Sequence, residues 1–203
     1  MSELPYPFPI RWYGDALDAY APFADRPGAF MVAIDKRYTL MGWQPLDTFS
    51  ATGAFVTMDG KTRIESPAEA LQKFVAPLQL LPKDPYYPFY SGLVGYMLPN
   101  WNTADGKTQN GGDIPDAWFG VYDPVVVYDG IEKKLTILSM GLDDDMSPNA
   151  ALAEDRATVL AQQLVRYNGK PTSTTQREAI TTASTPFTFM ALDTIQAQCA
   201  VTS

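Results

Sequence analysis

The sequence of 203 residues predicts an α+β fold with antiparallel sheets and helices packed against them. About seven or eight short segments have the composition of β-strands, and two pairs of them are joined by an Asp-Gly turn that is typical of hairpins. About three further segments have apolar side chains at helical spacing. Helices and strands occur in mixed order, which favours an antiparallel α+β fold over a doubly wound parallel sheet.

The first third of the chain contains one predicted helix and three predicted strands. Residues 15–20 have apolar side chains at helical spacing, and Pro22 stops this helix. The strands are predicted over residues 10–13, 29–34 and 38–43. The second of these is a continuous apolar run whose length suits a buried strand.

Two hairpins are predicted from Asp-Gly pairs that supply the positive φ angles of a tight turn. Asp59-Gly60 joins residues 54–58 to 61–64, and Asp129-Gly130 joins residues 125–128 to 134–140. A further strand is predicted over residues 117–123, whereas residues 48–52 alternate only weakly and residues 89–97 are an apolar run with two internal glycines.

Two more helices have start signals in the sequence. Ser66 is a predicted N-cap, with Pro67 at the first helical position and Glu69 three residues after the cap, and this helix stops before Pro77. A long helix opens at Ser147-Pro148 and is closed by Asn168-Gly169.

The chain is predicted to contain one domain, a linker and the start of another element. Residues 1–167 form the α+β domain, and residues 168–186 are a Thr/Ser-rich linker without periodicity. Residues 187–203 begin a helix of the next domain, so we expect the chain to be the front of a longer protein.

Composition excludes several classes of function. A net charge of −8 is unsuited to a nucleic-acid or anionic-membrane surface, since both require clustered lysine and arginine. The chain has one cysteine, Cys199, and no histidine, which excludes internal disulfides, Cys/His zinc sites and histidine-dependent nucleophiles. The N-terminus lacks the basic region of a signal peptide, and no apolar run reaches the roughly 20 residues of a membrane helix.

Two motifs have both a functional and a structural interpretation. Residues 92–96, Gly-Leu-Val-Gly-Tyr, suggest a phosphate loop but lack its spacing, so close backbone packing of the glycines is favoured. Residues 143–145 are three aspartates that suggest a metal site. They lack the ligand spacing of a calcium loop, and a solvated loop before a helix is favoured.

Two other residue pairs also have both a functional and a structural interpretation. Asp113 and Asp116 flank Pro115, and a turn is favoured over an acid–base pair, which would require two carboxyl groups of different pKa in one cleft. Trp43 and Trp101 are flanked by polar residues and are interpreted either as walls of a ligand pocket or as core, the second being favoured.

Three segments in order carry a resemblance to a known family. Residues 37–45 (RYTLMGWQP), 89–96 (FYSGLVGY) and 114–123 (IPDAWFGVYD) resemble motifs of the chorismate-utilising enzymes, namely component I of anthranilate synthase and of aminodeoxychorismate (para-aminobenzoate) synthase. Residues 187–197 resemble the helix that leads into the chorismate-binding domain of this family, in a form that suits the aminodeoxychorismate branch slightly better.

The resemblance implies the N-terminal, non-catalytic region of such an enzyme. Catalytic residues and the magnesium ligands would lie beyond Ser203, so no catalytic residue, metal ligand or cofactor is expected within the chain. The full enzyme would be cytoplasmic and would take ammonia from a glutamine amidotransferase partner. It would aminate chorismate to 4-amino-4-deoxychorismate for para-aminobenzoate and folate synthesis. The alternatives are the anthranilate branch, which serves tryptophan synthesis, and a stand-alone ligand-binding or interaction module.

The resemblance also implies a tryptophan pocket. In the family, tryptophan sits near an "LLES"-type strand end and the "RYSF" stretch. The corresponding residues are Ala33, Ile34, Asp35, Tyr38, Thr39 and Leu40, although the first motif lacks its serine here. An apolar strand end suits an indole, and Asp35 with backbone groups suits an ammonium. Core strands without a ligand are the alternative.

Overall fold

The structure, a computed structural model, describes residues 4–80, 87, 89–99, 101 and 114–182. The chain forms two compact units, each built on a five-stranded sheet. The first unit comprises Met1–Pro45, Pro82–Gly92 and Tyr122–Thr185, and the second comprises Leu46–Leu81, Leu93–Val121 and Pro186–Ser203. The predicted α+β class with antiparallel sheets is confirmed.

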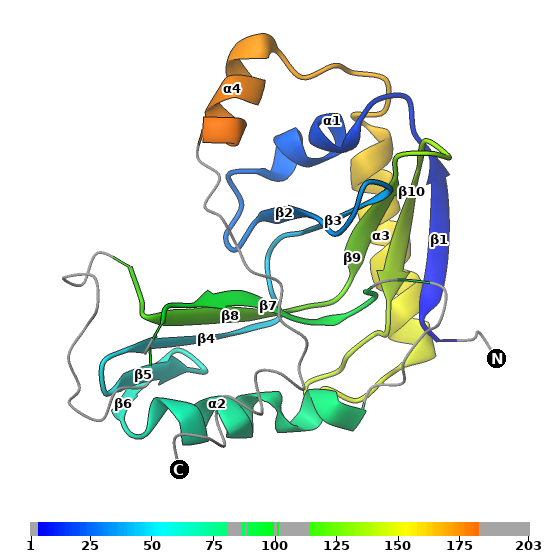
Figure 1. Cartoon of the computed structure of the whole chain (residues 1–203). Coiled ribbons are helices and arrows are strands. Elements are labelled where there is room, and N and C mark those ends of the chain that lie inside the picture. Colours follow the sequence, from blue (N-terminus) through cyan, green and yellow to red (C-terminus); the bar gives the residue numbers. More distant parts are fainter. Residues whose placement is uncertain (1–3, 81–86, 88, 100, 102–113, 183–203) are drawn as a thin grey trace. The chain divides into compact units, whose positions relative to one another are not determined.

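The first unit contains a sheet with the strand order β1-β10-β9-β3-β2 (Figure 1). Its strands are β1 (Tyr6–Arg11), β2 (Phe30–Ala33), β3 (Tyr38–Gly42), β9 (Val125–Asp129) and β10 (Lys134–Ser139). Its helices are α1 (Ala16–Tyr20), the short 3₁₀ turn η1 (Ala21–Phe23), α3 (Ala150–Val165) and α4 (Thr174–Thr182).

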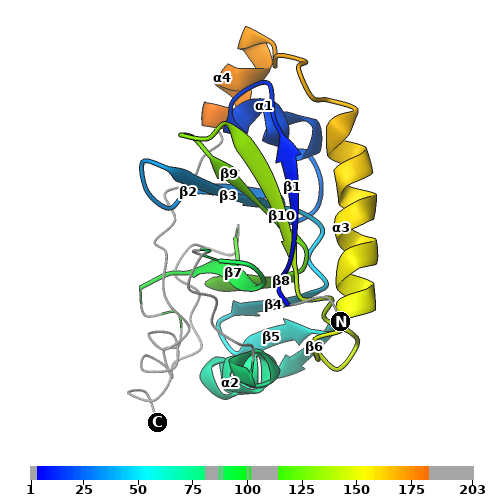
Figure 2. The same cartoon turned by 90° about the vertical axis from the view of Figure 1, so that its right-hand side faces the viewer.

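Helix α3 covers the sheet of the first unit along β1 and β10, as Figure 2 shows. Its buried side chains, Ala153, Ala157, Leu160, Ala161 and Leu164, recur at helical spacing and face the core. Each fully buried leucine contributes about 1.5–3 kcal/mol of hydrophobic stabilisation. The helix starts at N-cap Asn149, whose side chain accepts from the backbone N–H of Leu152, and not at the predicted Ser147-Pro148.

Strand β1 begins earlier than the sequence predicted and contains two prolines. Pro7 and Pro9 alternate with Tyr6, Phe8 and Ile10, so their missing N–H groups fall on one side of the strand. Because β1 is an edge strand paired only with β10 among the described strands, that side needs no donor. Proline is tolerated at sheet edges, and the sequence alone does not show which strand lies at an edge.

The second unit contains a sheet with the strand order β6-β5-β4-β8-β7. Its strands are β4 (Asp47–Thr52), β5 (Phe55–Met58), β6 (Lys61–Ile64), β7 (Gly92–Met97) and β8 (Ala117–Tyr122), and its helices are α2 (Pro67–Val75) and the 3₁₀ turn η2 (Ala76–Leu80). Helix α2 packs on β4 and β5, with Leu71 and Val75 buried beside Phe49 and Phe119.

Both predicted hairpins are confirmed, but their turns differ. Asp59 and Gly60 have φ angles of 50° and 67°, as the predicted two-residue turn requires. The β9–β10 connection is longer, because Asp129 pairs with Lys134 and the positive φ falls at Lys133. Asp129 Oδ1 instead accepts from the backbone N–H groups of Ile131 and Glu132, which closes this four-residue loop.

Helix α4 lies inside residues 168–186, the segment predicted to be a linker, and the sequence did not predict this helix. Arg177 of α4 forms ion pairs with Asp15 and Asp18, and Asp18 also accepts from the backbone N–H of Thr172. Burial alone would raise the pKa of Asp18, but these hydrogen bonds and Arg177 lower it. The contacts that hold this segment are polar and join residues more than 150 positions apart in the sequence. Such contacts produce no apolar periodicity within the segment, so no sign of the helix is visible in the sequence.

The predicted domain boundary at 167/168 stays a prediction, and residues 187–203 lie outside the described part.

Candidate functional site

The six residues of the predicted tryptophan pocket lie in one place, the β2–β3 hairpin. Ala33 pairs with Thr39 across the two strands, and the backbone N–H of Ile34 donates to Tyr38 O at 2.9 Å. Asp35 Oδ1 accepts from the backbone N–H groups of Arg37 and Tyr38 at 2.7 and 2.6 Å. The Asp35 carboxylate therefore closes the turn of this hairpin.

These six side chains do not share one surface. Leu40 is fully buried, Ala33 and Asp35 are exposed, and the others are half-buried. Since successive side chains of a strand point to opposite faces, Thr39 lies on the face opposite to Tyr38 and Leu40. Tryptophan binding at this hairpin stays a prediction.

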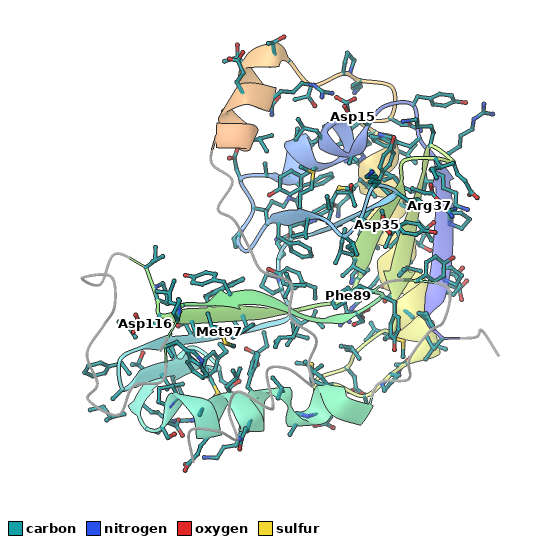
Figure 3. All side chains as sticks on the ribbon, viewed as in Figure 1. Asp15, Asp35, Arg37, Phe89, Met97 and Asp116 are labelled. Carbon is teal, nitrogen blue, oxygen red and sulfur yellow. The ribbon has the colours of Figure 1, made fainter. Side chains whose placement is uncertain are left out.

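The Arg37 side chain connects this hairpin to the β9–β10 turn. Figure 3 shows Arg37 close to Asp35, and its Nε donates to Asp129 Oδ2 at 2.8 Å while its guanidinium lies 4.8 Å from the centre of the Tyr38 ring. The hydrogen bond from Arg37 lowers the pKa of Asp129 from 3.8 to about 2. Arg37, the first residue of the 37–45 motif, is therefore a structural cation.

A second buried carboxylate organises the segment between β10 and α3. Asp123 Oδ1 accepts from the Met140 N–H at 2.7 Å, and Oδ2 accepts from the Leu142 N–H at 2.9 Å. The guanidinium of Arg156 in α3 donates to Asp123 Oδ2 at 2.9 Å and to Leu142 O at 2.8 Å. This carboxylate, at the end of the 114–123 motif, ties α3 to the sheet.

A cavity of about 280 Å³ lies beside this ion pair, within the first unit. Its walls come from the end of β3, the start of β9 and one face of α3: Gly42, Trp43, Gln44, Asp123, Pro124, Val126, Asp155, Arg156, Val159, Leu160 and Gln163. It combines an indole, an aliphatic surface and polar groups, which is the usual lining of a small-molecule site. None of the six residues predicted for tryptophan binding lines it.

Gln163 adds an unusual feature to this cavity. Its Oε1 is buried and has no hydrogen-bond partner in the part of the chain that the structure describes. A buried polar oxygen without a partner is uncommon in folded proteins, because its desolvation costs about 1–3 kcal/mol. A ligand or water carrying an N–H or O–H group would satisfy it.

The sequence marked one residue of this cavity and missed the others. Trp43 was one of two tryptophans weighed as a pocket wall, and it lines the cavity, whereas Trp101 is buried in the core of the second unit. Arg156 and Gln163 were missed. Their positions in the helix do not mark them in the sequence as cavity residues. They line the same cavity as Trp43 only because α3 packs beside the end of β3.

The remaining candidate motifs have structural roles. A Cβ atom on Gly95 would lie 2.0 Å from Trp118 O, so this glycine allows close contact between strands, as favoured above. Asp116 is buried and its Oδ2 accepts from the Gly53 N–H at 2.8 Å (Figure 3). Asp143 Oδ1 accepts from the N–H groups of Asp145 and Ser147, which makes it a turn residue. Asp113 lies outside the described residues.

Within the described residues, no group of three or more histidine, cysteine, aspartate or glutamate side chains is arranged to hold a metal ion. A search for membrane-spanning helices over the same residues finds none of sufficient length and hydropathy.

Comparison with known proteins finds likeness in structure and none in sequence. No protein family model matches the chain, and no curated protein matches it in sequence. Among solved structures, anthranilate synthase component I from Streptococcus pneumoniae TIGR4 is similar, with a TM-score of 0.47 and 14% sequence identity. The match covers 72% of this chain, and this chain spans only 32% of that one. The chain thus has a weak structural neighbour in anthranilate synthase component I, and at this level the likeness says nothing about its activity.

Proposed function

We propose that the chain is the N-terminal, non-catalytic region of a chorismate-utilising enzyme, in the branch that makes 4-amino-4-deoxychorismate. The observation that carries the proposal is the order and spacing of the motifs at residues 37–45, 89–96, 114–123 and 187–197.

Residues in three of these motifs have structural roles that support the proposal. Arg37 pairs with Asp129, Gly95 permits close strand contact, and Asp123 holds the loop before α3. A motif made of such residues is expected in a domain that supplies shape and packing surface to an enzyme while the chemistry takes place in another domain.

In the full enzyme, chorismate would lose its ring hydroxyl as water and gain an amino group. Ammonia would come from glutamine through a cytoplasmic glutamine amidotransferase partner. Magnesium and the catalytic side chains would belong to a domain beyond Ser203. The present region would add packing surface and a tryptophan site at residues 33–40.

The decisive experiment begins with the intact mass of the native polypeptide in its source cells. A mass of at least about twice the 22.4 kDa of this chain is expected. That full-length protein, supplied with chorismate, magnesium and ammonia or glutamine plus its partner, should form 4-amino-4-deoxychorismate. The 203-residue chain alone should form no product.

Each other outcome overturns a defined part of the proposal. Formation of anthranilate would assign the alternative branch, and turnover by the 203-residue chain would contradict the non-catalytic role. A native product of 22.4 kDa would favour the stand-alone module instead.

The tryptophan site is tested separately by calorimetric titration of the chain. Thr39→Val removes a half-buried hydroxyl from the hairpin, whereas Thr48→Val removes an exposed hydroxyl from β4 and is the matched control. Saturable binding that only Thr39→Val weakens is expected. The absence of saturable binding, or equal weakening by both changes, would contradict a site at residues 33–40.

A further inference from the structure

A second cavity, of about 360 Å³, adjoins the first along α3 in the same unit. The two cavities share Val159 and Gln163 in their walls. The second is further lined by Phe23, Arg26, Gln162, Arg166 and Tyr167. Its volume falls within the range of about 300–1,000 Å³ that is typical of small-molecule sites.

The charge of this second cavity is opposite to that of the chain. The chain has a net charge of −8, yet the described residues that line the cavity include two arginines and no acid. Among the described residues, neither Arg26 nor Arg166 forms an ion pair. By contrast, Arg37, Arg156 and Arg177 all pair with carboxylates. Unpaired guanidinium groups that face one cavity attract an anion.

The orientation of Arg26 is fixed by its neighbours. One guanidinium nitrogen, Nη1, donates to Gln44 Oε1 at 2.7 Å, and the group lies 5.0 Å from the centre of the Phe23 ring. A guanidinium has five N–H donors, so most of its donors are left over after this bond. Holding the side chain in place reduces the entropy lost when it binds an anion.

Aromatic rings form the apolar part of the walls. Phe23 stacks on Trp43 with ring centres 4.1 Å apart and planes within 1°, and Tyr167 meets Phe23 edge to face at 5.6 Å. Phe23 and Tyr167 line the second cavity, and Trp43 lines the first. Val159 adds an aliphatic side chain that is 48% exposed. These surfaces suit a planar apolar body.

The two adjoining cavities, joined at Val159 and Gln163, are called the α3 groove here. We propose that the α3 groove binds a small aromatic carboxylate. The carboxylate pairs with Arg26 and Arg166, the ring lies against Tyr167 and Val159, and a donor group on the ring reaches Gln163 Oε1, while Phe23 is buried behind Arg26 and Trp43. The site is separate from the hairpin residues 33–40, and it does not depend on the function proposed above.

The proposal is tested by titrating the ¹⁵N-labelled 203-residue chain with three probes and following its amide and indole resonances. Benzoate carries both a ring and a charge, benzamide lacks the charge, and inorganic phosphate lacks the ring. Benzoate should shift resonances of α3 and Trp43 saturably, with a dissociation constant in the millimolar range. Benzamide and phosphate should each bind at least about ten-fold more weakly, because each loses one class of contact. Equal binding of benzamide, or no saturable shift, would overturn the proposal.

Two charge-removing variants locate the anion. Arg166→Gln and Arg26→Gln should each weaken benzoate binding about five-fold, as expected for loss of one partly exposed charged contact. Arg63→Gln, an exposed arginine of β6 in the other unit, is the control and should leave binding unchanged. Wild-type affinity in both α3-groove variants would contradict the role of the arginines.

A matched pair on α3 tests the position with little risk to folding. Val159→Asp places a carboxylate at the junction of the two cavities and should weaken benzoate binding at least about ten-fold. Val165→Asp changes a residue of the same helix that is 55% exposed and lines neither cavity, so it should have little effect. Equal effects of the two changes would show a general charge effect and overturn the site.

Discussion

Nη2 of Arg37 lies 2.6 Å from Oδ2 of Asp129, and this ion pair joins the start of β3 to the end of β9. The Asp129 side chain is only 5% exposed, whereas that of Arg37 is 39% exposed. The buried Asp129 carboxylate is therefore neutralised by the partly exposed guanidinium of Arg37. The pair also fixes register, because Tyr38, the next residue, is the strand partner of Asp129.

Removal of the cation from this pair should destabilise the first unit. In Arg37→Gln the Asp129 carboxylate keeps its backbone donors but loses its charged partner, so the free energy of unfolding should fall by about 1–3 kcal/mol. Urea unfolding measures this change. Arg63→Gln, without an ion pair among the described residues, serves as control and should stay within about 0.5 kcal/mol of wild type. Equal stabilities of the two variants would exclude a structural role for the pair.

The same carboxylate predicts a dependence of stability on pH. The pKa of Asp129 is about 2 in the folded state and 3.8 without these partners, so the folded state favours the charged form. Its contribution is complete above about pH 4 and is lost as the pH falls from there toward 2. The size is about 1–2 kcal/mol after allowance for solvent screening at Arg37.

Unfolding of wild type and Asp129→Asn, compared from pH 5 to pH 2, measures this contribution. The stability difference between the two proteins should shrink with falling pH, since other acidic groups titrate in both. A difference that stays constant over this range would show that Asp129 is not the titrating group.

Gly95→Ala should destabilise the second unit through steric overlap. The added Cβ would lie 2.0 Å from Trp118 O and 2.6 Å from the Phe119 Cα, and neither backbone atom can move freely. A loss of about 3 kcal/mol or more is expected. Gly60→Ala is the comparison, because its Cβ meets open space and only the positive φ of 67° opposes it, at about 1–2 kcal/mol. A smaller effect at Gly95 than at Gly60 would contradict the close strand contact.

Asp123→Asn should loosen the attachment of α3. The variant loses the charged partner of Arg156 and weakens the hydrogen bonds to the Met140 and Leu142 N–H groups, at about 2–4 kcal/mol. Amide hydrogen exchange should rise in α3 and residues 140–142. Asp155→Asn, an exposed acid one position from Arg156, should change neither exchange nor unfolding free energy. Unchanged protection in Asp123→Asn would disprove this role.

Local sequence signals determined most of the secondary structure. Hairpins at Asp59-Gly60 and Asp129-Gly130 and the helix capped by Ser66 followed from residues a few positions apart, because turns and caps are short-range interactions. The mixed order of these elements then predicted an antiparallel α+β fold. Prolines are tolerated in an edge strand and disfavoured in a central one. The edge position of β1 in its sheet therefore allows Pro7 and Pro9 to be part of the strand.

Only the tertiary structure decided which distant side chains meet. Arg177 reaches Asp15, and Arg156 reaches Asp123, across separations that no periodicity encodes. The cavities on α3 have the same origin, since Trp43 was recognised from its polar neighbours but Gln163 and Arg166 were not. The polar residues of a helix cannot be told apart by their sequence pattern alone. Packing against one sheet face decides which of them line a cavity and which face solvent.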